Sequence, residues 1–209
     1  MGYLISLVHN LLIDTEHLHF WMQAIRQSSD HIRTMDAFWS GQLKSKEWLI
    51  NNLENFVTSE STIDIYGGWV GVLASMIFQS SIPISDIRSI DVDPTCEPIA
   101  SMMNKGEEMQ GRFSALTADM CHTSSNTDVV INTSCEHIAQ TQYKQWLSLM
   151  RPDSLLVLQS NNFVIPEHVR IAHSLDEFKL QCDIDVIWAG ELELPLYKRF
   201  MIIGNKHIS

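Results

Sequence analysis

One stretch decides the fold of this chain: Ser61-Thr-Ile-Asp-Ile-Tyr-Gly-Gly-Trp-Val-Gly-Val-Leu-Ala74. It begins as an apolar strand, passes through a glycine-rich turn and continues as an apolar helix. Glycine has no Cβ and tolerates positive φ, so Gly67, Gly68 and Gly71 would let a ligand lie against bare backbone. The N–H groups that open the helix would point at that ligand. The alternative is that the glycines only reverse the chain, and the turn alone does not decide between the two.

Three further apolar runs end in polar residues. Ile87-Arg-Ser-Ile-Asp-Val-Asp-Pro94 predicts a strand that ends at Asp91, and the run from Phe113 to Met120 contains Asp119 near its end. Asp128-Val-Val-Ile-Asn-Thr-Ser134 predicts a strand that enters a polar turn at Asn132. In open α/β sheets, ligands bind outside the carboxyl ends of the strands. The four runs together therefore predict one binding site at that edge of a parallel sheet.

This order of glycine turn, acid, acid and polar turn resembles the class I methyltransferases that use S-adenosylmethionine, over roughly residues 60 to 205. The resemblance implies that Asp64 and the loop Gly67–Gly71 face the methionine part of the cofactor. It also implies that Asp91 binds both ribose hydroxyls. Asp119 would accept from the adenine amino group, and the Met120 backbone N–H would meet a ring nitrogen.

The same resemblance places Asn132 where the methyl donor and the acceptor meet. Residues beside the motifs are expected to contact the cofactor as well: Tyr66, Trp69, Val92 and Lys46. For Lys46 the alternatives are a counter-ion to the cofactor's carboxylate and a lysine that snorkels at a helix start. The loop departs from the family's alternating glycines at Tyr66, Trp69 and Val70.

The segment Asn132-Thr-Ser-Cys-Glu-His137 supplies the candidate catalytic residues, which are Asn132, Glu136 and His137. The carboxylate and the imidazole could each take a proton from an acceptor atom, or could simply cap or pack against the next helix. Methylation of amino groups in nucleobases or glutamine is disfavoured, because the Pro-Pro-aromatic sequence usual in that subclass is absent. His168 and His173 are expected to be loop or helix-start residues, so no metal site is predicted.

The predicted fold class is a doubly wound α/β protein with a seven-stranded, mostly parallel sheet and a terminal antiparallel hairpin formed by residues 186–194 and 199–203. Residues 1–60 are expected to form a helical lid or extension packed on the core, and residues 61–209 the S-adenosylmethionine-binding α/β domain. In the first part we expect helices over 15–27 and 45–56, with Ser45 as an N-cap. Phe38, Trp39 and Gln42 are expected in a lid that excludes water.

Charge and composition narrow the class of partner. The net charge is −11, so a long phosphodiester would meet a repulsive field, and no nucleic-acid partner is expected. Residues 1–13 are apolar but too short to span a bilayer, and a packed helix is favoured over membrane contact. The four cysteines show neither metal-ligand spacing nor disulfide-rich density, which is typical of a cytoplasmic protein.

The predicted function is S-adenosylmethionine-dependent methyl transfer to a small-molecule acceptor. Two alternatives stay open. The same fold could direct another nucleophile at the sulfonium, by intramolecular cyclisation or aminocarboxypropyl transfer, and release methylthioadenosine. The chain could also be a non-catalytic cofactor-binding module, for which the altered glycine loop is an argument. The sequence predicts no oligomeric state.

Overall fold

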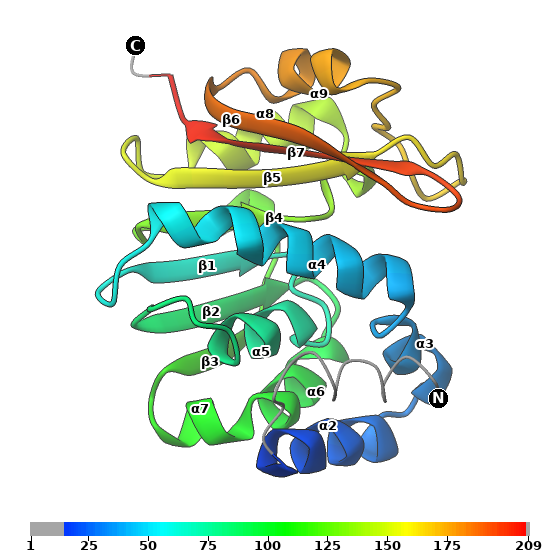
Figure 1. Cartoon of the computed structure of the whole chain (residues 1–209), viewed down its shortest axis with the longest axis vertical. Coiled ribbons are helices and arrows are strands. Elements are labelled where there is room, and N and C mark those ends of the chain that lie inside the picture. The colour runs from blue at the N-terminus through cyan, green and yellow to red at the C-terminus, as the bar shows by residue number, and fades with distance from the viewer. Residues whose placement is uncertain (1–14, 208–209) are drawn as a thin grey trace. The chain divides into compact units, whose positions relative to one another are not determined.

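The computed structural model describes residues 15–207 and contains a seven-stranded sheet in the order β3-β2-β1-β4-β5-β7-β6. Strand β1 pairs in parallel with β4, β2 with β3, and β4 with β5, whereas β7 is antiparallel to both β5 and β6. This confirms the predicted α/β fold class with its terminal hairpin. The strands, labelled in Figure 1, are β1 Thr62–Tyr66, β2 Asp86–Asp91, β3 Phe113–Thr117, β4 Val129–Asn132, β5 Leu155–Asn161, β6 Asp185–Glu193 and β7 Lys198–Asn205.

The described residues form two compact units. The first holds residues 15–61 and 68–117, and the second holds residues 62–67 and 118–207. The division predicted from the sequence, between residues 60 and 61, is a functional one between a lid and a binding domain. That division remains a prediction.

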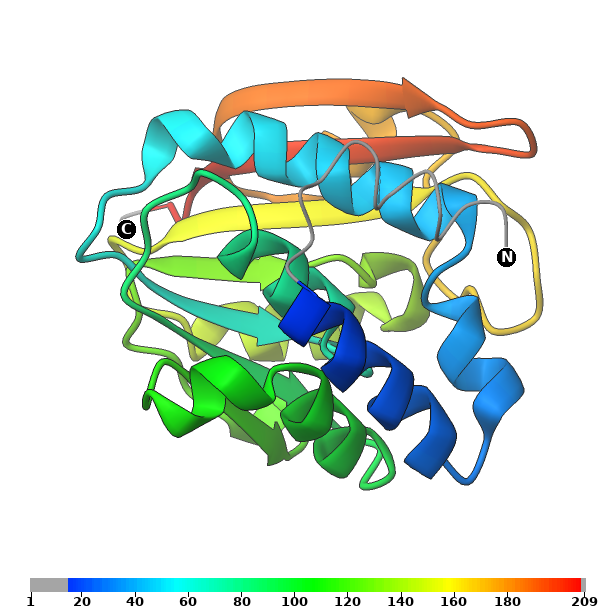
Figure 2. The same cartoon turned by 60° about the horizontal axis from the view of Figure 1, so that its bottom comes forward.

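The first unit contains most of the helices: α2 Thr15–Gln27, α3 His31–Asp36, α4 Ser40–Leu53, the 3-10 helix η1 Glu54–Phe56, α5 Val72–Phe78, α6 Cys96–Met103 and α7 Lys105–Met109. Helix α2 packs beside α6, as Figure 2 shows. Trp21 of α2 is buried, and its indole N–H donates to Ser75 Oγ at 2.7 Å. The ring of Phe38 lies 5.2 Å from that of Trp21, so Phe38 belongs to the core of this unit.

The expected N-cap at Ser45 is wrong. Helix α4 begins five residues earlier, at Ser40, and Ser45 lies buried inside it. The apolar stripe that includes Leu49 and Leu53 continues backward to the buried Leu43, so the helix gains buried surface by extending toward its N-terminus. Trp39, in an extended conformation, takes the N-cap position.

The second unit contains two α-helices, α8 Gln140–Ser148 and α9 Leu175–Cys182, and two short 3-10 helices, η2 Met120–His122 and η3 Cys135–His137. Trp146 of α8 packs edge-on against Tyr66 of β1, with ring centroids 5.5 Å apart. Helix α9 packs on β6 and β7. Helix α9 begins with a side-chain cap, because the Ser174 hydroxyl accepts the Glu177 N–H at 3.1 Å.

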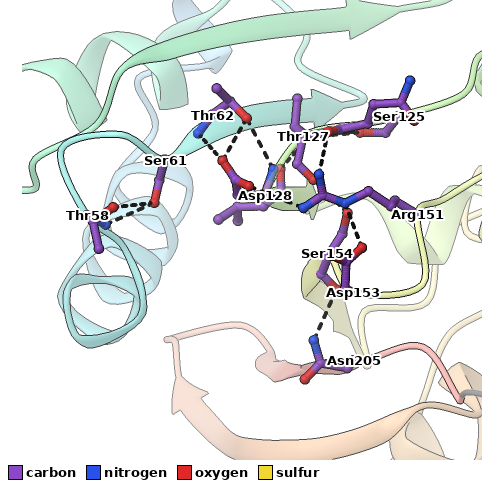
Figure 3. A network of polar contacts seen from close by, with 12 residues as sticks. Thr58, Ser61, Thr62, Ser125, Thr127, Asp128, Arg151, Asp153, Ser154 and Asn205 are labelled. Atoms are coloured by element: carbon purple, nitrogen blue, oxygen red, sulfur yellow. Dashed lines mark hydrogen bonds and ion pairs between the residues drawn. The ribbon is translucent and has the colours of Figure 1, made fainter.

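An exposed polar network fixes the start of β1 (Figure 3). Asp128 Oδ2 accepts from both the backbone N–H and the hydroxyl of Thr62, each at 3.0 Å. Arg151 donates to Asp128 Oδ1 at 3.2 Å and to the Asn126 carbonyl at 3.0 Å. The Thr62 hydrogen bonds lower the pKa of the Asp128 carboxyl. This corner therefore depends on an ionised Asp128.

All four cysteines are buried and free. Within residues 15–207, no helix is both long and apolar enough to cross a membrane. The apolar segment 1–13, for which a packed helix is expected, lies outside the described residues.

Candidate functional site

The glycine-rich loop between β1 and α5 is a tight turn held by its own backbone. The Gly71 N–H donates to the Gly68 carbonyl at 3.0 Å, and the Gly68 N–H donates to the Ile90 carbonyl at 3.0 Å. Trp69 has φ 51°, a left-handed conformation that costs a residue with a Cβ about 1 kcal/mol. Strain of this kind clusters at ligand-binding loops, because the surroundings must impose it. The loop thus keeps a turn in spite of its non-glycine residues.

Asp91 is the group that imposes this conformation. Its Oδ2 accepts the Trp69 N–H at 2.8 Å, and its Oδ1 accepts the Asp93 N–H at 3.0 Å. A carboxylate oxygen has two lone pairs, so each oxygen of Asp91 can accept one more hydrogen bond. Asp91 therefore orders the glycine loop and still has acceptor capacity for a ligand hydroxyl.

Gly71 is needed for packing. Its φ is 79°, and a Cβ placed there would lie 2.7 Å from Asn104 Nδ2 and 3.0 Å from Ala100. The same Asn104 Nδ2 donates to the Gly71 carbonyl at 3.1 Å. The close approach of α5 to α6 therefore explains this glycine without any ligand.

Sequence reasoning missed Arg33, which anchors the segment after Asp91. Its guanidinium lies 2.7 Å from Asp93 Oδ2 and donates to Thr95 Oγ1 at 3.2 Å. Thr95 in turn donates its backbone N–H and its hydroxyl to Asp93 Oδ1, and these hydrogen bonds lower the pKa of the Asp93 carboxyl. Helix α3 is thereby tied to the loop after β2. The two residues are 60 positions apart, so no local pattern signals this pair.

Among the other predicted residues of the first unit, Val92 is 70% exposed and Trp69 is half-buried. The indole N–H of Trp69 is buried and has no hydrogen-bond partner among the described residues. Lys46 is buried inside α4, and its ammonium donates to Gln42 Oε1 at 2.9 Å. Trp39, expected in a lid, is 64% exposed.

In the second unit, Asp119 and Met120 form a tight turn. Asp119 Oδ1 accepts the Cys121 N–H at 2.8 Å, so the carboxylate caps the 3-10 helix that starts at Met120. Its other oxygen lies 3.2 Å from His122 Nδ1. Asp119 is exposed and keeps lone pairs on both oxygens.

The two residues of β1 that were predicted to contact the cofactor are more buried than Asp119. Asp64 and Tyr66 are both fully buried, and the Tyr66 hydroxyl donates to the Thr123 carbonyl at 3.0 Å. Tyr66 therefore contributes its ring to the core. Gly67 has φ 64°, and a Cβ there would lie 3.3 Å from Ser134 Oγ, so the turns after β1 and β4 pass close to each other.

Asn132 ends β4 and shapes the turn that follows. Its Oδ1 accepts the Ser134 N–H at 2.9 Å, and the side chain is buried. The next residues form η3, which presents Glu136 and His137. The structure thus brings together the three candidate catalytic residues, which are Asn132, Glu136 and His137, within one short segment.

Glu136 is held by side chains from two neighbouring strands. It is 3% exposed; its Oε1 accepts from Asn161 Nδ2 of β5 and lies 3.5 Å from the Arg199 guanidinium of β7. Arg199 also donates to Gln159 Oε1 at 3.1 Å and to the Thr133 carbonyl. Sequence reasoning missed Arg199 in this role, because its partner Glu136 is 63 positions away.

His137 lies beside a second histidine that sequence reasoning did not assign to the site. The imidazole rings of His137 and His168 meet edge to face, with centroids 4.6 Å apart. Although His137 is exposed, partial desolvation of its ring lowers its pKa; Glu136 opposes this effect, and the nearby His168 adds to it. His173, also expected in a loop, is exposed and takes no part in this group.

Comparison with known proteins gives matches in structure only: no family model and no curated protein matches this chain. The mitomycin 7-O-methyltransferase MmcR is 15% identical with a TM-score of 0.63, and the match covers 88% of this chain. The pyocyanin biosynthetic protein PhzM is 14% identical with a TM-score of 0.62, and the match covers 90% of this chain. The chain spans 60% and 62% of the lengths of these two proteins.

A third neighbour matches over nearly its full length. The magnesium protoporphyrin IX methyltransferase ChlM of Synechocystis PCC 6803, solved with bound SAH, is 13% identical with a TM-score of 0.63. The match covers 97% of this chain and 99% of that protein. At these identities the likeness concerns the fold. The sheet order, the terminal hairpin and these neighbours together show that this chain has the fold of the class I methyltransferases.

Proposed function

We propose that this chain is an S-adenosylmethionine-dependent methyltransferase that acts on a small-molecule acceptor. The observation that carries the proposal is the double role of Asp91, which accepts the Trp69 N–H of the glycine loop and the Asp93 N–H after β2 and retains acceptor lone pairs. A group at the end of the second strand with these properties suits the vicinal hydroxyls of a ribose.

Other residues fit the remaining parts of this cofactor. The exposed Val92 offers apolar surface to a purine, and Trp69 is proposed to contact the cofactor as well. Asp119 retains acceptor capacity for the adenine amino group, and the Met120 backbone N–H is proposed to meet a ring nitrogen. Asp64, Tyr66, Gly67, Gly68, Gly71 and Lys46 are proposed to serve the methionine part, with Lys46 as counter-ion to its carboxylate. The neighbour ChlM, solved with SAH, supports a cofactor of this class.

The cofactor, when bound, supplies a methyl group on a sulfonium that already has a good leaving group. The chain's own task is therefore to align the acceptor and to exclude water. We assign alignment to Asn132, and the handling of the acceptor's proton to Glu136 or His137. No large charge needs to develop on the protein for this chemistry, so a modest set of polar groups is sufficient.

Small-molecule acceptors are favoured by the net charge of −11, which opposes long nucleic acids. Two neighbours point the same way, since their names give mitomycin and magnesium protoporphyrin IX as the compounds they methylate. We propose a protein of the cytoplasm on the strength of its reduced cysteines.

The test is to incubate the protein with S-adenosylmethionine and a panel of small hydroxyl and amine acceptors, and to identify the by-product. Methyl transfer predicts S-adenosylhomocysteine in amounts equal to a methylated product. Methylthioadenosine would instead indicate cyclisation or aminocarboxypropyl transfer. Cofactor binding without any by-product over the whole panel would favour a non-catalytic module.

A further inference from the structure

Three side chains at the end of β4 form a group that the sequence did not predict. Glu136, His137 and His168 each offer one potential metal-ligand atom, and these atoms all lie within 4.8 Å of one another. One carboxylate with two imidazoles is a ligand set that proteins use for zinc and for non-haem iron. All three belong to the same compact unit, in which η3 and the segment after β5 present them.

Only one oxygen of the Glu136 carboxylate has hydrogen-bond partners among the described residues. Oε1 takes both protein partners, the Asn161 amide and the Arg199 guanidinium. Oε2 is buried and has no hydrogen-bond partner among the described residues. Leaving a carboxylate oxygen buried without a partner is expensive, so this atom calls for a cation or a donor beyond those that the described residues provide.

Both imidazoles are oriented so that each keeps a nitrogen lone pair for a ligand. His168 Nδ1 lies 2.7 Å from the Phe163 carbonyl, which can only accept, so Nδ1 carries the proton and Nε2 carries the lone pair. The Glu167 backbone raises the pKa of His137, which fits a ring N–H directed at the Glu167 carbonyl. Metal-ligating histidines almost always donate their other ring N–H to a carbonyl or a carboxylate in this way.

We propose that Glu136 Oε2, His137 and His168 Nε2 bind one divalent transition-metal ion of the zinc class. Two imidazoles disfavour Mg²⁺ and Ca²⁺, which prefer oxygen ligands. Zinc–ligand bonds of about 2.1 Å hold cis ligands about 3 to 3.5 Å apart, so the ion draws the three atoms closer together. The exposed His137 and half-buried His168 can move by this amount. Three protein ligands would leave at least one coordination position open for an acceptor oxygen, and an ion there would replace Glu136 or His137 in promoting loss of that oxygen's proton.

Among the described residues, two guanidinium groups near this site oppose a cation, those of Arg170 and Arg199. Arg170 donates to the Cys135 carbonyl at 3.2 Å and to Gln140 Oε1 at 2.9 Å. The charge of Arg199 is directed at Glu136 Oε1 and at the Thr133 carbonyl, and not at Oε2. Arg199 and Asn161 fix the carboxylate so that Oε2 faces away from them. We therefore expect a site of moderate affinity whose carboxylate ligand is fixed in advance, which reduces the entropic cost of binding.

The experiment uses the full chain, stripped of metal with a chelator, and titrates it with Zn²⁺ by calorimetry and with Co²⁺ by visible absorption. His168→Gln removes a ligand at a half-buried position, and His173→Gln is the control, an exposed histidine of the same unit outside the group. We expect one equivalent of Zn²⁺ to bind to the wild type and to His173→Gln, and at least about tenfold weaker binding to His168→Gln.

Circular dichroism of each metal-free variant verifies that it is folded. Zinc should raise the melting temperature of the wild type and of His173→Gln, and at the same zinc concentration should raise that of His168→Gln by less. Absence of stoichiometric binding, or equal affinity in all three proteins, would overturn the proposal. Neither readout involves S-adenosylmethionine, so the metal site and the proposed methyl transfer can fail independently.

Discussion

Gly71→Ala should destabilise the protein through two separable effects. The left-handed φ of 79° costs alanine about 1 kcal/mol, because its Cβ crowds the backbone. The new Cβ would also lie 2.7 Å from Asn104 Nδ2 and 3.0 Å from the Ala100 backbone, and overpacking of this kind costs about 1 to 3 kcal/mol. The expected loss in unfolding free energy is therefore about 2 to 4 kcal/mol.

Gly111→Ala is the matched control for this variant. Gly111 has φ 74°, but nothing lies within 4 Å of the position its Cβ would take. It should lose only the backbone part, about 1 kcal/mol. Urea unfolding followed by far-UV circular dichroism measures both variants against the wild type. Equal losses in the two variants would refute the claim that the approach of α5 to α6 requires Gly71.

Three further predictions test other parts of the structure. Asp128→Asn should lower the unfolding free energy by about 1 kcal/mol at pH 7, a figure reduced for solvent screening of this exposed carboxylate. Because the pKa of Asp128 is lowered in the folded state, the stability difference between wild type and variant should be present above about pH 4 and vanish as the pH falls through that pKa. A difference in urea midpoint that does not change with pH would contradict this prediction. Burial raises the pKa of Cys135 to about 12 and that of Cys96 to about 11, so a thiol reagent at pH 8 should label neither until the protein unfolds, as mass spectrometry of the labelled peptides would show. Asp119→Asn should weaken S-adenosylmethionine binding in calorimetry, since an acceptor-only carboxylate becomes a mixed amide, and an unchanged dissociation constant would remove Asp119 from the adenine site.

The sequence was sufficient for the sheet, because strands and their polar ends carry local signals. The runs that end at Tyr66, Asp91 and Asn132 became β1, β2 and β4 within a residue of the predicted bounds. Helix starts were harder to predict. Ser45, expected as an N-cap, lies in the middle of a helix, because burial of Leu43 outweighed a local capping preference.

The candidate site was predictable only where its residues are neighbours in the chain. Glu136 and His137 are adjacent, and both were identified. Three residues of the candidate site contact partners that lie 31 to 63 positions away in the sequence: Arg33, Arg199 and His168. Such contacts depend on which strands and loops meet in the folded chain. The role of Asp91 in holding the Trp69 N–H also depends on tertiary structure, because the two residues are 22 positions apart.

The most direct test of the central claim is a calorimetric titration of S-adenosylmethionine into the wild type and into Asp91→Asn. The wild type should bind one equivalent, and the variant should bind about 30- to 150-fold more weakly, since charged hydrogen bonds to the ribose contribute about 2 to 3 kcal/mol. Because Asp91 also accepts the Trp69 and Asp93 N–H groups, the variant's melting temperature must be recorded to verify that it remains folded at the temperature of the titration. No binding by the wild type, or undiminished affinity in a folded Asp91→Asn, would contradict the account.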